Sequence, residues 1–281
     1  MSKIGGKKNN LKKIIKQITV SKTPLYRNIE KSSSLISECI FGEEFIIYDQ
    51  TKNWSFGCLT QDSYKGWTLS ENLGNNLNND YIVSTNSSTI LTQPDIKSKL
   101  IETIPIGSRV KVLGKFDNWY KIQIPNSTKN SYGYCPYVHL IKIKQNLNWK
   151  LLKLIMKQMI GTPYLWGGRT NFGIDCSGLL QMLFNFAGIS IPRDTHQQVK
   201  FFNNSKLFNL INTDKTFDYH NDITTGDIIF WKGHVGIMFS QKFLLHSNAF
   251  HMGVFIEPLK DTINRHARQN LKISSVFRYF K

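Results

Sequence analysis

The sequence predicts a multidomain chain in which two small all-β barrels precede an α+β domain. Three observations support this fold class. Two segments of the first half repeat each other 65 positions apart, as at Gly42 and Gly107. Near Asn148 the short alternating strands give way to apolar residues at helical spacing. Strand-like runs joined by tight turns then follow the helices, an order typical of α+β domains.

The repeat is built from short alternating strands with Gly and Asn turns between them. In each copy the glycine is followed by an Asn-Trp pair (Trp54, Trp119) and then by a Gly-aromatic pair. This spacing predicts small β-barrels, which we place at residues 19–75 and 80–143. The pattern resembles bacterial SH3-like domains. We expect both tryptophans in the barrel cores.

The third domain is predicted to span residues 148–281. Apolar residues from Trp149 to Met159 have helical spacing, and a second, nearly all-apolar helix follows Asp175 and ends at Gly188. Three strands follow, at 227–231, 235–239 and 243–246.

Composition and charge narrow the functional classes. The chain has 281 residues, of which 41% are hydrophobic and 20% charged, as in a globular protein. It has no apolar run of membrane-spanning length, so no membrane span is expected. The net charge of +17 would attract an anionic substrate. The lysines are spread along the chain, so we expect no nucleic-acid partner. The exception is a basic N-terminal arm, residues 1–18, which lacks the features of a secretory signal. We therefore expect a cytoplasmic protein.

The four cysteines form neither a CxxC pair nor a metal-ligand spacing with histidine, so no metal is expected. Cys39, Cys58 and Cys135 lie among strand-like residues and are predicted to be small core residues. Cys176 is different, because it lies where a glycine-rich loop enters the second helix. A helix N-terminus favours a thiolate and supplies N–H groups for an oxyanion. A buried structural cysteine is the alternative at this position.

A nucleophilic cysteine also needs a base, and histidine is the usual one. His234 begins a strand after a tight turn, and His246 ends the next strand. Adjacent antiparallel strands can bring the two side chains together, so that His246 would orient His234. Asp175, beside the cysteine, is predicted to cap the helix and to orient the loop or bind an amine.

Six motifs in order resemble the NlpC/P60 peptidases: 161–168 (GTPYLWGG), 175–178 (DCSG), 192–195 (PRDT), 226–227 (GD), 234–237 (HVGI) and His246. The resemblance covers roughly residues 150–281 and implies a papain-like α+β fold that needs no cofactor. It implies that Cys176 is the nucleophile, His234 the general base and His246 the third, orienting residue. Threonine replaces the serine that this family usually has at position 195.

The resemblance also implies substrate-binding residues. In the catalytic domain these are Tyr164, Asp175, Ser177, Arg193, Asp194 and Thr195. In the first SH3-like domain we expect Glu43 and Tyr64 to read a free amine, and Trp67 to contact a ligand or the neighbouring domain.

The arrangement of tandem SH3-like domains ahead of this domain resembles the γ-D-glutamyl-L-diamino acid endopeptidases that recycle peptidoglycan peptides. It implies hydrolysis of the γ-D-glutamyl amide bond in peptides with a free N-terminal L-Ala. Three alternatives stay open: an exported enzyme that cuts intact wall peptides, a non-enzymatic SH3-type wall-binding module, and an acyltransferase or amidase on the same fold.

Overall fold

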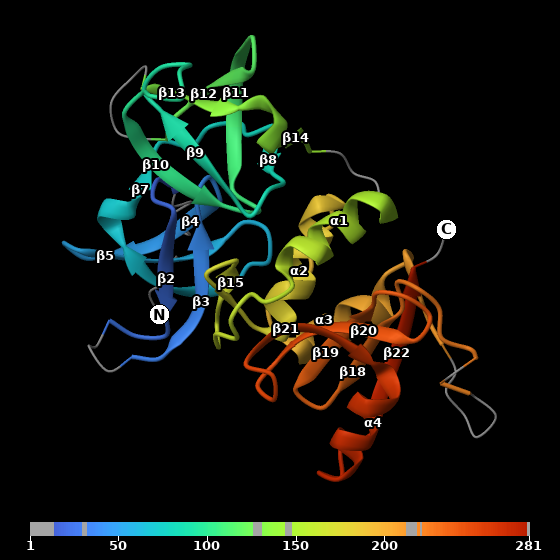
Figure 1. Cartoon of the computed structure of the whole chain (residues 1–281). Coiled ribbons are helices and arrows are strands. Elements are labelled where there is room, and N and C mark those ends of the chain that lie inside the picture. Colours follow the sequence, from blue (N-terminus) through green and yellow to red (C-terminus); the bar gives the residue numbers. More distant parts are fainter. Residues whose placement is uncertain are drawn as a thin grey trace, which may run out of the picture.

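The computed structural model describes residues 14–29, 33–125, 131–143, 148–211, 218–219 and 221–279. The chain forms two strand-rich units followed by a mixed unit, which confirms the predicted fold class (Figure 1). The two strand-rich units, blue to green, lie one above the other, and the third unit, yellow to red, lies beside them. Residues 1–13 of the predicted basic arm lie outside the described residues.

The first unit is one antiparallel sheet in the order β3-β2-β6-β5-β4-β1-β7. Its strands are β1 (Ile14–Ile18), β2 (Lys22–Tyr26), β3 (Leu35–Ile40), β4 (Glu44–Gln50), β5 (Trp54–Leu59), β6 (Lys65–Leu69) and β7 (Leu73–Gly74), with a 3-10 turn, η1 (Ser70–Asn72), before β7. β1 pairs with β4 and β7. Residues 14–18 thus belong to this sheet, and the predicted boundary of the arm at residue 18 is wrong.

The second unit repeats the first, with the strand order β10-β9-β13-β12-β11-β8-β14. Its strands are β8 (Tyr81–Val83), β9 (Ser87–Leu91), β10 (Leu100–Pro105), β11 (Arg109–Phe116), β12 (Trp119–Gln123), β13 (Tyr132–Pro136) and β14 (Leu140–Lys142), with η2 (Tyr137–His139) before β14. The repeat glycines Gly42 and Gly107 both have positive φ, 80° and 83°, in equivalent turns. The turn therefore explains why both copies carry glycine there.

The barrel cores differ in detail from the prediction. Trp54 and Trp119 are partly exposed, so their assignment to the cores is wrong. The buried clusters of the two barrels consist mostly of aliphatic side chains. Cys39, Cys58 and Cys135 are buried and free, as predicted.

The third unit packs four helices against a six-stranded antiparallel sheet in the order β17-β22-β18-β19-β20-β21. The helices are α1 (Trp149–Met159), α2 (Cys176–Phe186), α3 (Thr195–Asn204) and α4 (Leu259–Ala267). The strands are the short hairpin β15 (Arg169–Thr170) and β16 (Gly173–Ile174), and the sheet strands β17 (Phe208–Leu210), β18 (Ile228–Trp231), β19 (His234–Met238), β20 (Phe243–Asn248), β21 (Gly253–Pro258) and β22 (Ile273–Tyr279).

Helix α2 is buried between α1 and the sheet, because it is apolar nearly all round. Its core continues into the second unit, where Ile82 and Ile106 join the same cluster. Gln158 of α1 also donates a hydrogen bond of 3.0 Å to the Ser84 carbonyl. None of the helices in the described ranges is long and apolar enough to cross a membrane.

Candidate active site

Cys176 is the first residue of α2, where the sequence places it. Asp175 caps the helix, because its Oδ1 accepts a hydrogen bond of 2.7 Å from the Gly178 N–H. The other oxygen of Asp175 accepts one of 2.9 Å from the Gly167 N–H. One carboxylate thus ties the glycine-rich loop to the helix start and fixes the backbone around Cys176.

The resting thiol of Cys176 differs from the expectation of a stabilised thiolate. Burial, followed by the negative charge of Asp175, raises its pKa to about 12. Hydrogen bonds from backbone Val235 and Ser177 and the charge of Arg193 act in the opposite direction but do not outweigh burial. The sulfur is therefore protonated at neutral pH, and its proton must be removed during the reaction rather than before it.

The two predicted histidines form a hydrogen-bonded chain that ends on a carboxylate. Nε2 of His234 lies 2.8 Å from Nδ1 of His246, and Nε2 of His246 lies 2.7 Å from Oε1 of Glu257. The chain crosses β19, β20 and β21, which are neighbours in the sheet. His234 stands at the mouth of the β18–β19 turn, where Gly233 has a φ of 78°.

The carboxylate fixes the tautomers of both rings. An ionised carboxylate only accepts hydrogen bonds, so His246 donates from Nε2, and its neutral ring then accepts at Nδ1. His234 must donate to it from Nε2, which leaves Nδ1 of His234 bare. Burial lowers the pKa of both histidines, so both rings are neutral at neutral pH. The bare Nδ1 is the form of histidine that can accept a thiol proton.

Sequence reasoning missed Glu257. Its carboxylate also accepts hydrogen bonds from His251, Thr262 and Arg265. Burial raises the pKa of Glu257, but the hydrogen bonds from His246, Arg265 and His251 outweigh it and hold that pKa well below the ordinary range. A single acid inside the apolar run of β21 was a signal for it, because a buried carboxylate needs partners. The sequence alone does not say that the partner is His246, on the neighbouring strand.

Two pockets meet at Cys176. The first, of about 280 Å³, lies toward the first strand-rich unit and is lined by Arg27, Ile36 and Tyr64 of that unit as well as by Cys176. The second, of about 380 Å³, lies toward α4 and is lined by Cys176, His234 and Tyr164. We call them the SH3-side pocket and the α4 pocket. Burial raises the pKa of Tyr164 to about 12, so its phenol keeps its proton and can donate beside Cys176.

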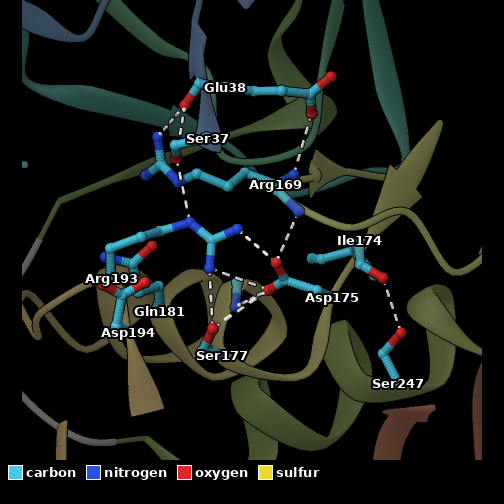
Figure 2. A network of polar contacts seen from close by, with 12 residues as sticks. Ser37, Glu38, Arg169, Ile174, Asp175, Ser177, Gln181, Arg193, Asp194 and Ser247 are labelled. Carbon is cyan, nitrogen blue, oxygen red and sulfur yellow. Dashed lines mark hydrogen bonds and ion pairs between the residues drawn. The ribbon is translucent and has the colours of Figure 1, made fainter. Parts of the chain in front are cut away.

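Asp175, Ser177 and Arg193 form a closed polar network beneath the SH3-side pocket (Figure 2). Arg193 is 2% exposed and donates to both of the others and to Ser37 of β3. Their polar groups are thus engaged with one another. All three residues also line the SH3-side pocket, so the network holds the backbone at Cys176 in place and the predicted substrate-binding role stays a prediction.

Glu43 does not lie in the cleft, so its predicted role as a reader of an amine is wrong. Its carboxylate is 1% exposed and forms a bidentate ion pair with Arg169, at 2.8 and 2.9 Å. Arg169 also contacts Glu38 of β3, through its backbone N–H and its guanidinium (Figure 2). Acids of the first unit therefore hold the hairpin that follows the glycine-rich loop.

The acidic residue that forms a hydrogen bond with Tyr64 is Asp194, not Glu43. The Tyr64 hydroxyl donates to Asp194 Oδ1 at 3.2 Å, and both residues line the SH3-side pocket together with Thr195. Within the described residues Asp194 forms no ion pair. Trp67 packs against Phe56 and does not line this pocket.

Comparison with known families agrees with this architecture. Residues 161–271 match the NlpC/P60 family, residues 25–73 match the bacterial dipeptidyl-peptidase Sh3 domain, and residues 88–141 match the bacterial SH3 domain. The chain thus carries an NlpC/P60 peptidase domain, that of a hydrolase, preceded by two bacterial SH3 domains.

Individual relatives carry related names. A γ-D-glutamyl-L-lysine dipeptidyl-peptidase of Bacillus cereus is 25% identical over 82% of this chain and 72% of that protein. A protein of the same name from Bacillus subtilis is 35% identical over 37% of this chain and 33% of that protein. Dipeptidyl-peptidase 6 of Lysinibacillus sphaericus is 24% identical over 80% of this chain and 84% of that protein. The crystal structure of an NlpC/P60 family protein from Bacillus cereus shares the fold, with a TM-score of 0.77 and 19% identity over 95% of this chain and 100% of that chain.

Proposed function

We propose that this protein is a cysteine peptidase that hydrolyses the γ-D-glutamyl–L-diamino acid amide bond of peptidoglycan-derived peptides with a free N-terminal L-Ala. The observation that carries the proposal is the hydrogen-bonded chain from Glu257 through His246 to His234, because His234 lines the same pocket as Cys176. The name of the Bacillus cereus relative at 25% identity, a γ-D-glutamyl-L-lysine dipeptidyl-peptidase, supports the bond, and that of the relative at 24% identity supports a dipeptidyl-peptidase.

The reaction uses the neutral pair of Cys176 and His234. His234 takes the thiol proton as the sulfur attacks the γ-carbonyl carbon. The oxyanion is held by N–H groups at the start of α2, and Tyr164 can donate a further hydrogen bond. His234 then gives the proton to the leaving amine, and the acyl group remains as a thioester. Water, deprotonated by the same ring, attacks the thioester and releases the acid and the free thiol.

The SH3-side pocket provides a binding site for the free N-terminal amine of the substrate. Asp194 supplies a carboxylate without an ion pair in the described part of the chain, and Tyr64 orients it. Arg27, Ile36 and Tyr64 bring the first SH3 domain to this side of the pocket. A peptide that ends in an ammonium fits this arrangement, whereas an intact wall peptide continues beyond its L-Ala through an amide.

The test is an incubation of the purified protein with L-Ala-γ-D-Glu-L-Lys and its N-acetylated analogue, read by mass spectrometry. We expect cleavage of the free-amine peptide only, and none by Cys176→Ala. Equal cleavage of both peptides would favour the exported wall hydrolase. Cleavage of neither, with the diaminopimelate peptides also intact, would refute the substrate assignment. The recycling role further proposes a cytoplasmic location, and recovery of the native protein from the outer wall fraction of cells would contradict it.

A further inference from the structure

In the proposed reaction, the acyl half of the substrate occupies the SH3-side pocket. The ligand of the α4 pocket therefore has to be identified separately. It shares only Cys176 and Gly233 with the SH3-side pocket, so the two lie on either side of the sulfur. An acyl transfer to sulfur separates the substrate into an acyl part and a leaving amine. Each part must therefore occupy a different side of Cys176.

The position of His234 decides which part lies where. His234 lines the α4 pocket and not the SH3-side pocket. The leaving nitrogen has to receive its proton from this ring, so it must lie within hydrogen-bond reach of it. The leaving amino acid therefore enters the α4 pocket. This step rests on the proposed function, in which the acyl half occupies the pocket of Tyr64 and Asp194.

The lining of the α4 pocket is suited to an anion. Among the described residues that line it, Arg265 is the only residue with a full charge at neutral pH, and none is Asp or Glu. Asn248 and Gln269 add amide groups, and the amide nitrogen of Asn248, in a side chain 7% exposed, has no hydrogen-bond partner among the described residues.

Arg265 is held in place before any ligand arrives. Both of its terminal nitrogens donate to Glu257, and its guanidinium lies 4.4 Å from the centre of the Phe250 ring. Glu257 does not itself line the pocket. A guanidinium has five N–H donors, of which Glu257 takes two, so donors remain for a second carboxylate.

We propose that the α4 pocket is a leaving-group subsite that binds the free α-carboxylate of a single leaving diamino acid, through Arg265 with Gln269 at its rim. The leaving group is thus one amino acid rather than a longer peptide. An amide in place of the carboxylate, or a further residue attached to it, removes the negative charge that Arg265 binds and lowers kcat/KM.

The test compares L-Ala-γ-D-Glu-L-Lys with the same peptide as its C-terminal amide, using the full-length protein. We expect kcat/KM to be at least about ten-fold higher for the free acid, the effect of one charge-assisted hydrogen bond. The acid-to-amide ratio should fall in Gln269→Glu and rise in Gln269→Lys. Gln269 is exposed on the surface and its side chain has no partner within the described residues, so folding should be unaffected. Lys260→Glu, a charge change at the other end of α4, is the matched control and should leave the ratio unchanged.

The outcomes separate this inference from the function on which it rests. Cleavage of acid and amide at equal rates, or a ratio that is the same in both Gln269 variants, overturns the subsite and leaves the peptidase assignment in place. Cleavage of neither peptide by the unaltered protein overturns both.

Discussion

Replacement of Glu257 by glutamine tests whether the Glu257 carboxylate, acting through His246, sets the tautomer of His234. The change keeps size and shape but turns one acceptor oxygen into an amide donor. If the amide oxygen still faces His246, a charged hydrogen bond becomes a neutral one, which weakens it by about 1 kcal/mol, or roughly five- to ten-fold in rate. If the amide nitrogen faces His246 instead, both tautomers reverse and Nδ1 of His234 carries a proton. An error of this kind in a catalytic triad lowers kcat by up to about 10⁴.

We therefore expect kcat of Glu257→Gln to fall at least about five-fold, with KM changed far less, because no substrate group touches Glu257 in the proposed reaction. The pH profile supplies a second readout. The charge of Glu257 raises the pKa of His234 against the larger effect of burial, so its removal lowers that pKa further. The acid limb of kcat/KM should move to lower pH.

The assay is the cleavage of the free-amine tripeptide between pH 4.5 and 8, with thermal unfolding measured in parallel. Asp261→Asn is the matched control, because it removes one exposed negative charge from the same helix that carries Arg265. A kcat within about two-fold of the unaltered protein, with an unmoved acid limb, would refute the tautomer argument. A merely structural role would lower the unfolding temperature without moving that limb.

Four further measurements follow from the structure. Glu43→Gln should lower the free energy of unfolding by about 3 kcal/mol in a urea titration, because it leaves Arg169 buried without its charged partner. Alkylation of Cys176 by iodoacetamide should accelerate steadily from pH 6 to 9, since burial raises its thiol pKa to about 12. Asp194→Asn should reduce the preference for a free amine over its acetylated form by at least about ten-fold. The folded state lowers the pKa of His234, so the unfolded chain binds protons first and stability should fall as the pH drops below 6.5.

Each of these has its own contrary result. Glu44→Gln, on the partly exposed neighbour of Glu43, is the control for the first and should change stability little; equal losses in both would contradict a special role of the buried pair. A plateau of the alkylation rate near pH 7 would show a stabilised thiolate. An unchanged amine preference would remove Asp194 from the binding site. A melting temperature that is flat from pH 7.5 to 5 would contradict the histidine shift.

How much the sequence predicts depends on whether the interaction is local. Helix α1 has the predicted bounds, because the amphipathic spacing from Trp149 to Met159 lies in one short window. The cap at Asp175 was likewise predicted from its neighbours. Glu43 was misassigned because its partner, Arg169, lies 126 residues away. No local pattern distinguishes an acid that faces a cleft from one that faces a buried guanidinium.

The same long-range contacts give the first SH3 domain a structural role at the active site. Arg169 and Arg193 are buried, and their guanidinium groups donate to residues of the first unit that lie on β3 and just before β4. Arg193 also donates a hydrogen bond to Asp175, which caps α2 next to Cys176. Movement of the first SH3 domain would therefore disturb the backbone around the Cys176 sulfur. The position of the first SH3 domain relative to Cys176 is therefore held by a buried ion pair and buried hydrogen bonds. A site fixed in this way can select peptides by length, which the catalytic residues alone cannot do.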